Sequence, residues 1–301
     1  MTRFLPKDRL AAGVVIVTLI FYSIMLWYPI LDDFALSLHS GLALKRSWVG
    51  LANFRQLTED KYFRQAIGVT FKYALIVVPF ATAFGLLLAA VMNSIRNVTV
   101  RTLFTSLFFF PNIVPLAATV SFWKFLLAPT QNGIINGFLG IFGLGPVQWL
   151  ENVQTALPSL AAVSIWGGMG YVMILLLAGM QSIPRMFYEA AAIDGANAWA
   201  RFWRITVPLL MPTLTFVVVV STLGSLMMFE PVYIMTGGHV SHDPKGGPAG
   251  STTTVIWLVY TLAFVNFKQG YAAAVAVVWF FVMLALGVIQ FRVMSSLRYE
   301  Y

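Results

Sequence analysis

Long apolar stretches without a charge, separated by short charged segments, most constrain what this chain of 301 residues can fold into. A helix rises about 1.5 Å per residue, so crossing a hydrocarbon core of roughly 30 Å takes about 20 apolar residues. Six uncharged stretches reach that length, at residues 10–31, 73–92, 102–123, 155–180, 208–229 and 270–291. The sequence therefore predicts an all-α, polytopic membrane protein with six transmembrane helices.

The composition agrees with residence in a lipid bilayer. Hydrophobic residues make up 59% of the chain and charged residues 10%, whereas a soluble domain carries about 25% charged residues. The net charge is +8, but the basic residues lie between apolar stretches, where membrane topology and anionic lipid explain them. We therefore expect the lipid bilayer, and no nucleic acid, as a partner. The chain has no cysteine, which excludes disulfides and thiolate chemistry.

Two stretches need separate treatment. The apolar stretch at 10–31 is longer than the 7–15 residues typical of a signal peptide, so it is expected to be a retained anchor. A seventh uncharged stretch, 251–267, is too short for a span. It predicts a short helix against the bundle at the outer membrane edge.

The basic residues also predict the orientation. One side of the membrane holds ten of them in short segments, while the other nine are spread over longer loops or lie at a span end. The ten are Arg3, Lys7, Arg9, Arg96, Arg101, Arg185, Arg201, Arg204, Arg292 and Arg298. Because short cytoplasmic loops are enriched in Lys and Arg, both termini are expected to be cytoplasmic.

The spans hold no ionisable residue near their middle, although ion-coupled transporters usually keep one there. The phosphate-binding pattern G-x-x-x-x-G-K-[ST] is also missing, so the energy for driven transport would come from another subunit. A stand-alone secondary transporter or channel remains an alternative, as does a membrane enzyme. No metal site is expected, because His239, His242 and Asp243 lie in a loop rich in Gly and Pro.

Proline and glycine mark places where the predicted spans break or approach each other closely. Pro79 lies in the second predicted span, Pro111 and Pro115 in the third, and Gly167, Gly168 and Gly170 in the fourth. Such breaks are compatible with a bundle that moves around a central cavity. From polarity, aromatic character and placement, the candidates for a substrate path are Asn112, Trp166, Tyr171 and Glu230.

The segment between the fourth and fifth spans predicts a helix, a tight turn and a second helix on the cytoplasmic side. Pro184 suits a first helical turn, and good helix formers follow through Ile193. Gly195 provides a left-handed stop, and Asn197 can cap the next helix. This loop, 184–207, has small alanines for close approach and charges for pairing, as a docking element needs. The alternative is a hairpin that merely joins two spans.

The same loop carries a family pattern. Glu189-Ala190-Ala191, three residues, Gly195, nine residues and Ile205-Thr206-Val207-Pro208 resemble the EAA-x3-G-x9-I-x-L-P loop of the permease subunits of binding-protein-dependent ABC importers. Val207 replaces the preferred leucine, which is a mild apolar change.

Further segments resemble the carbohydrate-uptake branch of that family, and within it the MalF-like or UgpA-like permease. These are 48–54, Pro129 with 133–136, and 266–267 with 270–274. After Gly238 the outer loop inserts residues 239–246 and is longer than the family usually has.

The resemblance implies one permease domain over residues 1–301, of the type I ABC importer kind, in a bacterial plasma (inner) membrane. It implies a second homologous permease, two copies of an ABC ATPase that holds the ATP and Mg²⁺, and an extracytoplasmic solute-binding protein. This chain would itself be no enzyme and hold no cofactor. The ATPase-coupling residues would be Tyr188, Glu189, Ala190, Ala191, Ala192, Asp194, Gly195, Ile205 and Pro208. The solute could be an oligosaccharide, a monosaccharide derivative or a glycerol phosphate.

Overall fold

A computed structural model describes residues 6–41, 45–130, 133–237 and 245–295 of the chain. These residues are mostly helical, which confirms the all-α prediction. Within them, the two strands are the short β1 and β2, which pair antiparallel over His39–Ser40 and Ser47–Trp48. The chain divides into two compact units. The first holds the residues up to Asp60 with Val259–Trp279, and the second holds Lys61–Leu258 with the chain from Phe280 onward.

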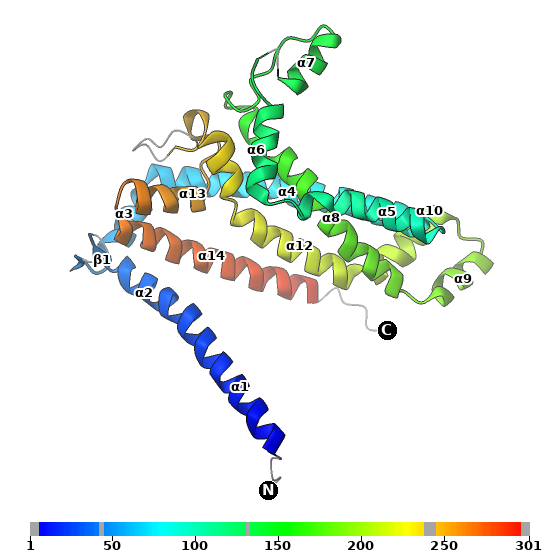
Figure 1. Cartoon of the computed structure of the whole chain (residues 1–301), viewed down its shortest axis with the longest axis horizontal. Coiled ribbons are helices and arrows are strands. Elements are labelled where there is room, and N and C mark those ends of the chain that lie inside the picture. The colour runs from blue at the N-terminus through cyan, green and yellow to red at the C-terminus, as the bar shows by residue number, and fades with distance from the viewer. Residues whose placement is uncertain (1–5, 42–44, 131–132, 238–244, 296–301) are drawn as a thin grey trace. The chain divides into compact units, whose positions relative to one another are not determined.

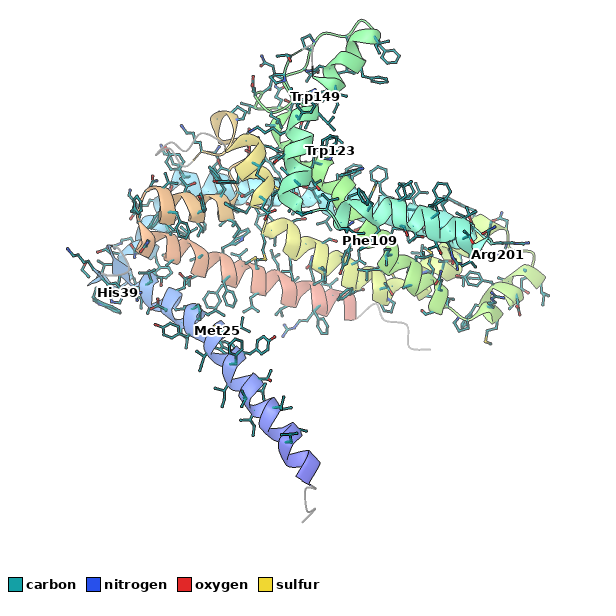
Figure 2. The ribbon with its side chains drawn as sticks, viewed as in Figure 1. Met25, His39, Phe109, Trp123, Trp149 and Arg201 are labelled. Carbon is teal, nitrogen blue, oxygen red and sulfur yellow. The ribbon has the colours of Figure 1, made fainter. Side chains whose placement is uncertain are left out.

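The first unit begins with one long apolar helix. It runs through α1, η1 and α2, which span Pro6–Tyr22, Ser23–Trp27 and Tyr28–Ser37. Its side chains are exposed from Leu10 to Leu31, as Met25 shows in Figure 2. A helix that is apolar on every side and exposed is stable in contact with lipid.

Asn53, from the 48–54 segment, connects the C-terminal end of α2 to the β1–β2 hairpin. Its amide group donates hydrogen bonds to the carbonyl oxygens of Ser37 and His39, each at 2.8 Å. Asn53 lies at the start of α3 and is buried. Arg46 adds a bidentate pair with Asp32, at 2.7 and 2.9 Å. The remaining elements of the first unit are α3 at Ala52–Glu59, η6 at Thr261–Val265 and the start of α14, which spans Gln269–Ser295.

The second unit is built on two long helices, α4 (Lys61–Ser94) and α8 (Ala156–Ser182), which pack along each other (Figure 1). The helix α12 (Met211–Leu226) packs against both. Their shared core is apolar and includes Met92, Met173, Leu176, Leu210 and Val217. Glycine allows the backbones to approach closely, as is common between membrane helices. A Cβ atom on Gly170 would overlap the carbonyl oxygen of Phe108.

Two of the predicted spans are bent rather than straight. The third consists of α5, η2 and α6, at Val98–Phe109, Phe110–Asn112 and Leu116–Leu126, with an 88° bend before α6. The fifth follows α10, η3 and α11, at Ala198–Arg201, Phe202–Thr206 and Val207–Leu209, with a 67° bend before α12. A proline lies at each break, Pro115 directly before α6 and Pro212 in the first turn of α12, and it lacks the N–H that a continuing helix would use. Among the described residues, four helices are long and apolar enough to cross a membrane, or up to six if each bent pair is one span.

The short helix expected within 251–267 is present as α13 (Val255–Tyr260) followed by η6. Its first turn lies inside the second unit, because Val255 and Leu258 are fully buried. The threonines before it are buried too, and the Thr254 hydroxyl donates to the Met228 carbonyl at 2.9 Å. The remaining elements of this unit are α7 at Ile134–Ile141, α9 at Arg185–Ile193, η4 at Val232–Thr236 and η5 at Pro248–Gly250.

The glycine at the close approach of α8 gives a stability test. We expect Gly170→Ala to destabilise the fold by about 1–3 kcal/mol, because the added methyl group meets fixed backbone. The control is Gly167→Ala, one turn earlier on α8, where a Cβ atom meets nothing within 4 Å. Thermal unfolding of the purified chain in detergent measures both. Equal melting temperatures for the two variants would contradict the close packing.

Candidate functional site

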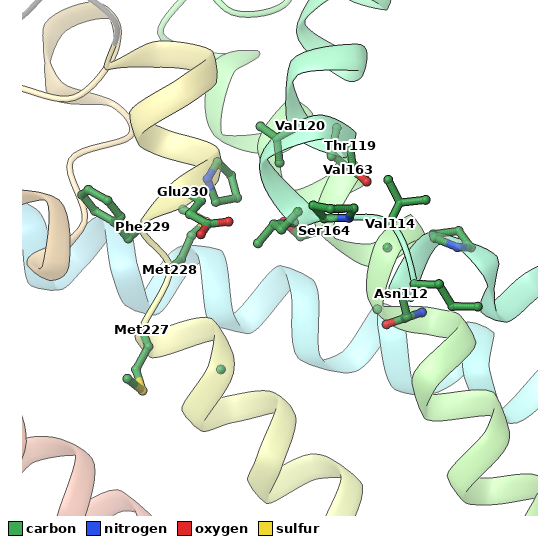
Figure 3. A pocket seen from close by; sticks show the side chains of 18 of the residues that line it. Asn112, Val114, Thr119, Val120, Val163, Ser164, Met227, Met228, Phe229 and Glu230 are labelled. Carbon is green, nitrogen blue, oxygen red and sulfur yellow. The ribbon is translucent and has the colours of Figure 1, made fainter. Parts of the chain in front are cut away.

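A cavity of about 780 Å³ lies in the second unit, next to the break between η2 and α6 and to the residues that follow α12 (Figure 3). Its walls come from α4, from η2 and the start of α6, from the middle of α8, and from the segment that follows α12. The lining residues are Tyr73, Pro111, Asn112, Ile113, Val114, Pro115, Leu116, Thr119, Val120, Val163, Ser164, Gly167, Gly168, Gly224, Met227, Met228, Phe229, Glu230 and Pro231.

The backbone beside the cavity is irregular after α12. Residues Met227–Phe229 are not helical, so their carbonyl groups do not belong to a continuous helix. One of them, on Met228, accepts the hydroxyl of Thr254. The next element, η4, is held by Lys124 at the end of α6. The ammonium group of Lys124 donates to the Ile234 carbonyl at 2.7 Å. The segment that carries Glu230 is thus tied to its neighbours on both sides.

Few polar side chains face the cavity, and one of them is charged. Glu230 is exposed, and its carboxylate extends from the break toward the α8 wall in Figure 3. On α8, Ser164 is hydrogen-bonded to the side chain of Tyr73. Asn112 and Thr119 complete the polar lining. Within the described part of the chain, no lysine, arginine or histidine lines this cavity.

The cavity contains two of the four residues that the sequence singles out for a substrate path. Asn112 and Glu230 line it, while Trp166 and Tyr171 do not. Trp166 instead packs edge-on against Trp123, with ring centroids 5.4 Å apart. Tyr171 lies on α8 and is exposed. Ser164 and Thr119 were not among the predicted residues, because a single hydroxyl in an apolar stretch does not indicate what it faces.

Asn136, from the 133–136 segment, has a structural role at the start of α7. Asn136 is buried, and its amide group donates to the carbonyl oxygens of Ala128 and Val147, each at 3.0 Å. Its oxygen accepts from the Val147 amide and from the Trp149 ring nitrogen, also at 3.0 Å. Four hydrogen bonds on one side chain explain why an asparagine suits this turn.

The loop between α8 and α12 has the helix, turn and helix that the sequence predicts. The helix α9 ends at Ile193, and Gly195 has a φ of +75°, which favours glycine. The Ala196 amide then donates back to the Ala191 carbonyl at 2.9 Å, which closes the helix end. The Asn197 side chain accepts from the Ala200 amide at 2.8 Å and caps α10.

This turn presents α9 as an open surface. No residue of α9 is buried, and Glu189, Ala190, Ala192 and Asp194 are exposed. Ile193 is 88% exposed, which is unusual for an isoleucine in a monomer. Tyr188 is partly buried instead, because its hydroxyl lies 3.0 Å from that of Thr206 and joins α9 to the following helix.

The last two predicted coupling residues lie within that following helix. Ile205 is in η3 and Pro208 is in α11. The fifth span was predicted to begin at 208, but the helix already begins at Ala198 and its break comes at Leu210. Trp199 and Trp203, which are 70% and 48% exposed, were not among the predicted coupling residues.

A metal centre finds no support in the described part of the chain, where no three histidine or acidic residues are grouped. The loop residues His239, His242 and Asp243 lie outside the described residues.

The sequence matches the family described as "Binding-protein-dependent transport system inner membrane component" over residues 81–298. It is 34% identical to the lactose transport system permease protein LacF of Rhizobium radiobacter, over 89% of this chain and 88% of that protein. It is 33% identical to the sn-glycerol-3-phosphate transport system permease protein UgpA of Salmonella typhimurium, over 99% and 97%.

The fold resembles a chain in the crystal structure of a bacterial ABC transporter involved in the import of the acidic polysaccharide alginate. The TM-score is 0.84, with 23% sequence identity, and the match covers 96% of each chain.

The Tyr188–Thr206 hydrogen bond can be tested by a double-mutant cycle. We expect Tyr188→Phe and Thr206→Val each to destabilise the loop by about 1 kcal/mol, since each removes one partner of the pair. The double variant should lose little more than either single variant. Hydrogen exchange of the α9 and α10 amides measures the opening of the loop. Strictly additive effects would show that the two hydroxyls do not act together.

Proposed function

The chain belongs to the family of inner membrane components of binding-protein-dependent transport systems, and on that premise we propose that it is a permease subunit of an ATP-driven importer for a sugar. The observation that carries this proposal is the exposed helix and turn at 185–197, placed in the same second unit as the cavity. The relatives named for lactose and glycerol phosphate transport support a sugar or a related solute.

In this proposal α9 is the surface on which an ABC ATPase docks. Glu189 and Asp194 offer charges to the partner, and Ala190 and Ala192 let its backbone approach closely. ATP and Mg²⁺ stay on the two ATPase subunits, and this chain carries no cofactor and no catalytic residue. Closure of the ATPase pair would move α9, and the Tyr188–Thr206 contact would pass that movement to the helix that continues into α12.

The cavity then forms part of the solute path. A second, homologous permease would supply the facing wall, and an extracytoplasmic solute-binding protein would deliver the solute. Movement of the bent segments around this cavity would open it to one side of the membrane and then to the other. We place the protein in a bacterial inner membrane as a multi-pass subunit, with both termini in the cytoplasm.

A solitary secondary transporter or channel is the alternative. It would carry solute without ATP and without a docking partner. The described spans show no ionisable residue near their middle that favours a secondary transporter. A solitary transporter also does not need an exposed docking surface such as α9.

The turn at Gly195 tests the docking role. We expect Gly195→Val to lower ATP-dependent uptake by more than about tenfold, because a β-branched residue resists a φ of +75° and distorts the end of α9. A Cβ atom there meets nothing within 4 Å, so the core should be unaffected. Uptake is measured in vesicles, together with the amount of ATPase that co-purifies with the chain.

The matched control is Gly143→Val. Gly143 has a φ of +73° and open space around its Cβ position, but it lies in the loop after α7. This variant carries the same backbone strain and should keep both uptake and ATPase. Full uptake by Gly195→Val, or flux without ATP in the native chain, would refute the importer proposal.

A further inference from the structure

The charge of the cavity narrows the class of solute. Its one charged lining residue in the described chain is Glu230, and no basic side chain lines it. We propose that this subunit selects for uncharged sugars and against anionic ones, with Glu230 as the specificity-determining residue. This inference rests on the proposed function and goes further, since that function leaves neutral sugars and glycerol phosphates equally open.

A carboxylate suits a neutral sugar because it accepts two hydrogen bonds from neighbouring hydroxyl groups. Such charge-assisted hydrogen bonds are roughly twice as strong as neutral ones. Asn112 and Thr119 offer further donors and acceptors on the other side of the cavity. The rest of the lining is mostly apolar, with Met227, Val163 and Pro111 among its members, and can contact the C–H faces of a sugar ring.

The same arrangement disfavours an anion. A carboxylate or phosphate group on the solute would be repelled by Glu230 and would leave water without a cation to pair with. Lys124 does not provide that cation, because it is absent from the lining and its ammonium group donates to the Ile234 carbonyl. The desolvation free energy of an anionic substrate would thus not be offset by a cation of this cavity lining.

The size of the cavity agrees with a sugar of a few rings at most. Small-molecule sites commonly measure about 300–1,000 Å³, and this one measures about 780 Å³. In the proposed importer a second permease supplies the opposite wall of the cavity. The effect of the Glu230 charge is therefore best tested by substituting Glu230 in the assembled transporter.

The experiment uses the complete importer, with its solute-binding protein, reconstituted in proteoliposomes with ATP inside. The probes are radiolabelled lactose and maltose, which are neutral, and sn-glycerol-3-phosphate and a uronate disaccharide, which are anionic. We expect import of a neutral probe and none of either anion. Glu230→Gln should raise the KM of the imported probe about tenfold with kcat less affected, since a neutral acceptor binds hydroxyls more weakly. Glu230→Lys should lower import by more than tenfold.

The control is Glu151→Lys, which makes the same charge change at an exposed residue outside the cavity and should import as the native chain does. Import of an anionic probe in preference to both neutral ones would overturn the inference while leaving the importer function in place. Unchanged neutral-sugar import by Glu230→Lys would also overturn it. If the native complex imports none of the four probes with ATP, the proposed function fails together with the inference.

Discussion

The structure depends on one constraint: inside a bilayer, each backbone polar group must find its partner within the protein. A helix break therefore needs a replacement partner. Here the break after α12 is held by the hydroxyl of Thr254 on the Met228 carbonyl, and the turn that follows is held by Lys124 on the Ile234 carbonyl. The break between η2 and α6 and the residues after α12 border the same cavity. Irregular backbone in a bilayer is tolerated where it lines such a space, which links these two segments to the proposed solute path.

The close packing of α8 against α4 and α5 supports these irregular segments. Glycine at 85 and 170 permits approaches that a larger residue would prevent, since a Cβ atom would overlap Val172 in one case and the Phe108 carbonyl in the other. Gly167 and Gly168 lie on α8, as Gly170 does, but they have open space around their Cβ positions and line the cavity. One helix thus uses its glycines both to pack and to leave room for a solute.

The sequence predicts the loop at 184–207 more completely than it predicts the residues that line the cavity. Gly195 and Asn197 act through dihedral angles and hydrogen bonds within four residues, so the turn and the cap are correctly predicted from their order alone. The substrate-path residues depend on which helix faces they occupy. Asn112 and Glu230 line the cavity, but Trp166 turns to Trp123, and Ser164 was not anticipated. The role of Asn136 likewise rests on partners 8 to 13 residues away.

The sequence by itself determined that this chain is helical, belongs in a membrane and carries a helix–turn–helix loop, because hydropathy, helix caps and glycine stops act over short stretches. The tertiary structure decided how sharply the chain bends at its prolines, by 88° and 67°, and it decided the exposure of α9. It also decided that Glu230 faces a cavity whose described lining has no cation. These features arise from contacts between segments far apart in the chain, and no local pattern specifies which side chains such contacts bring together.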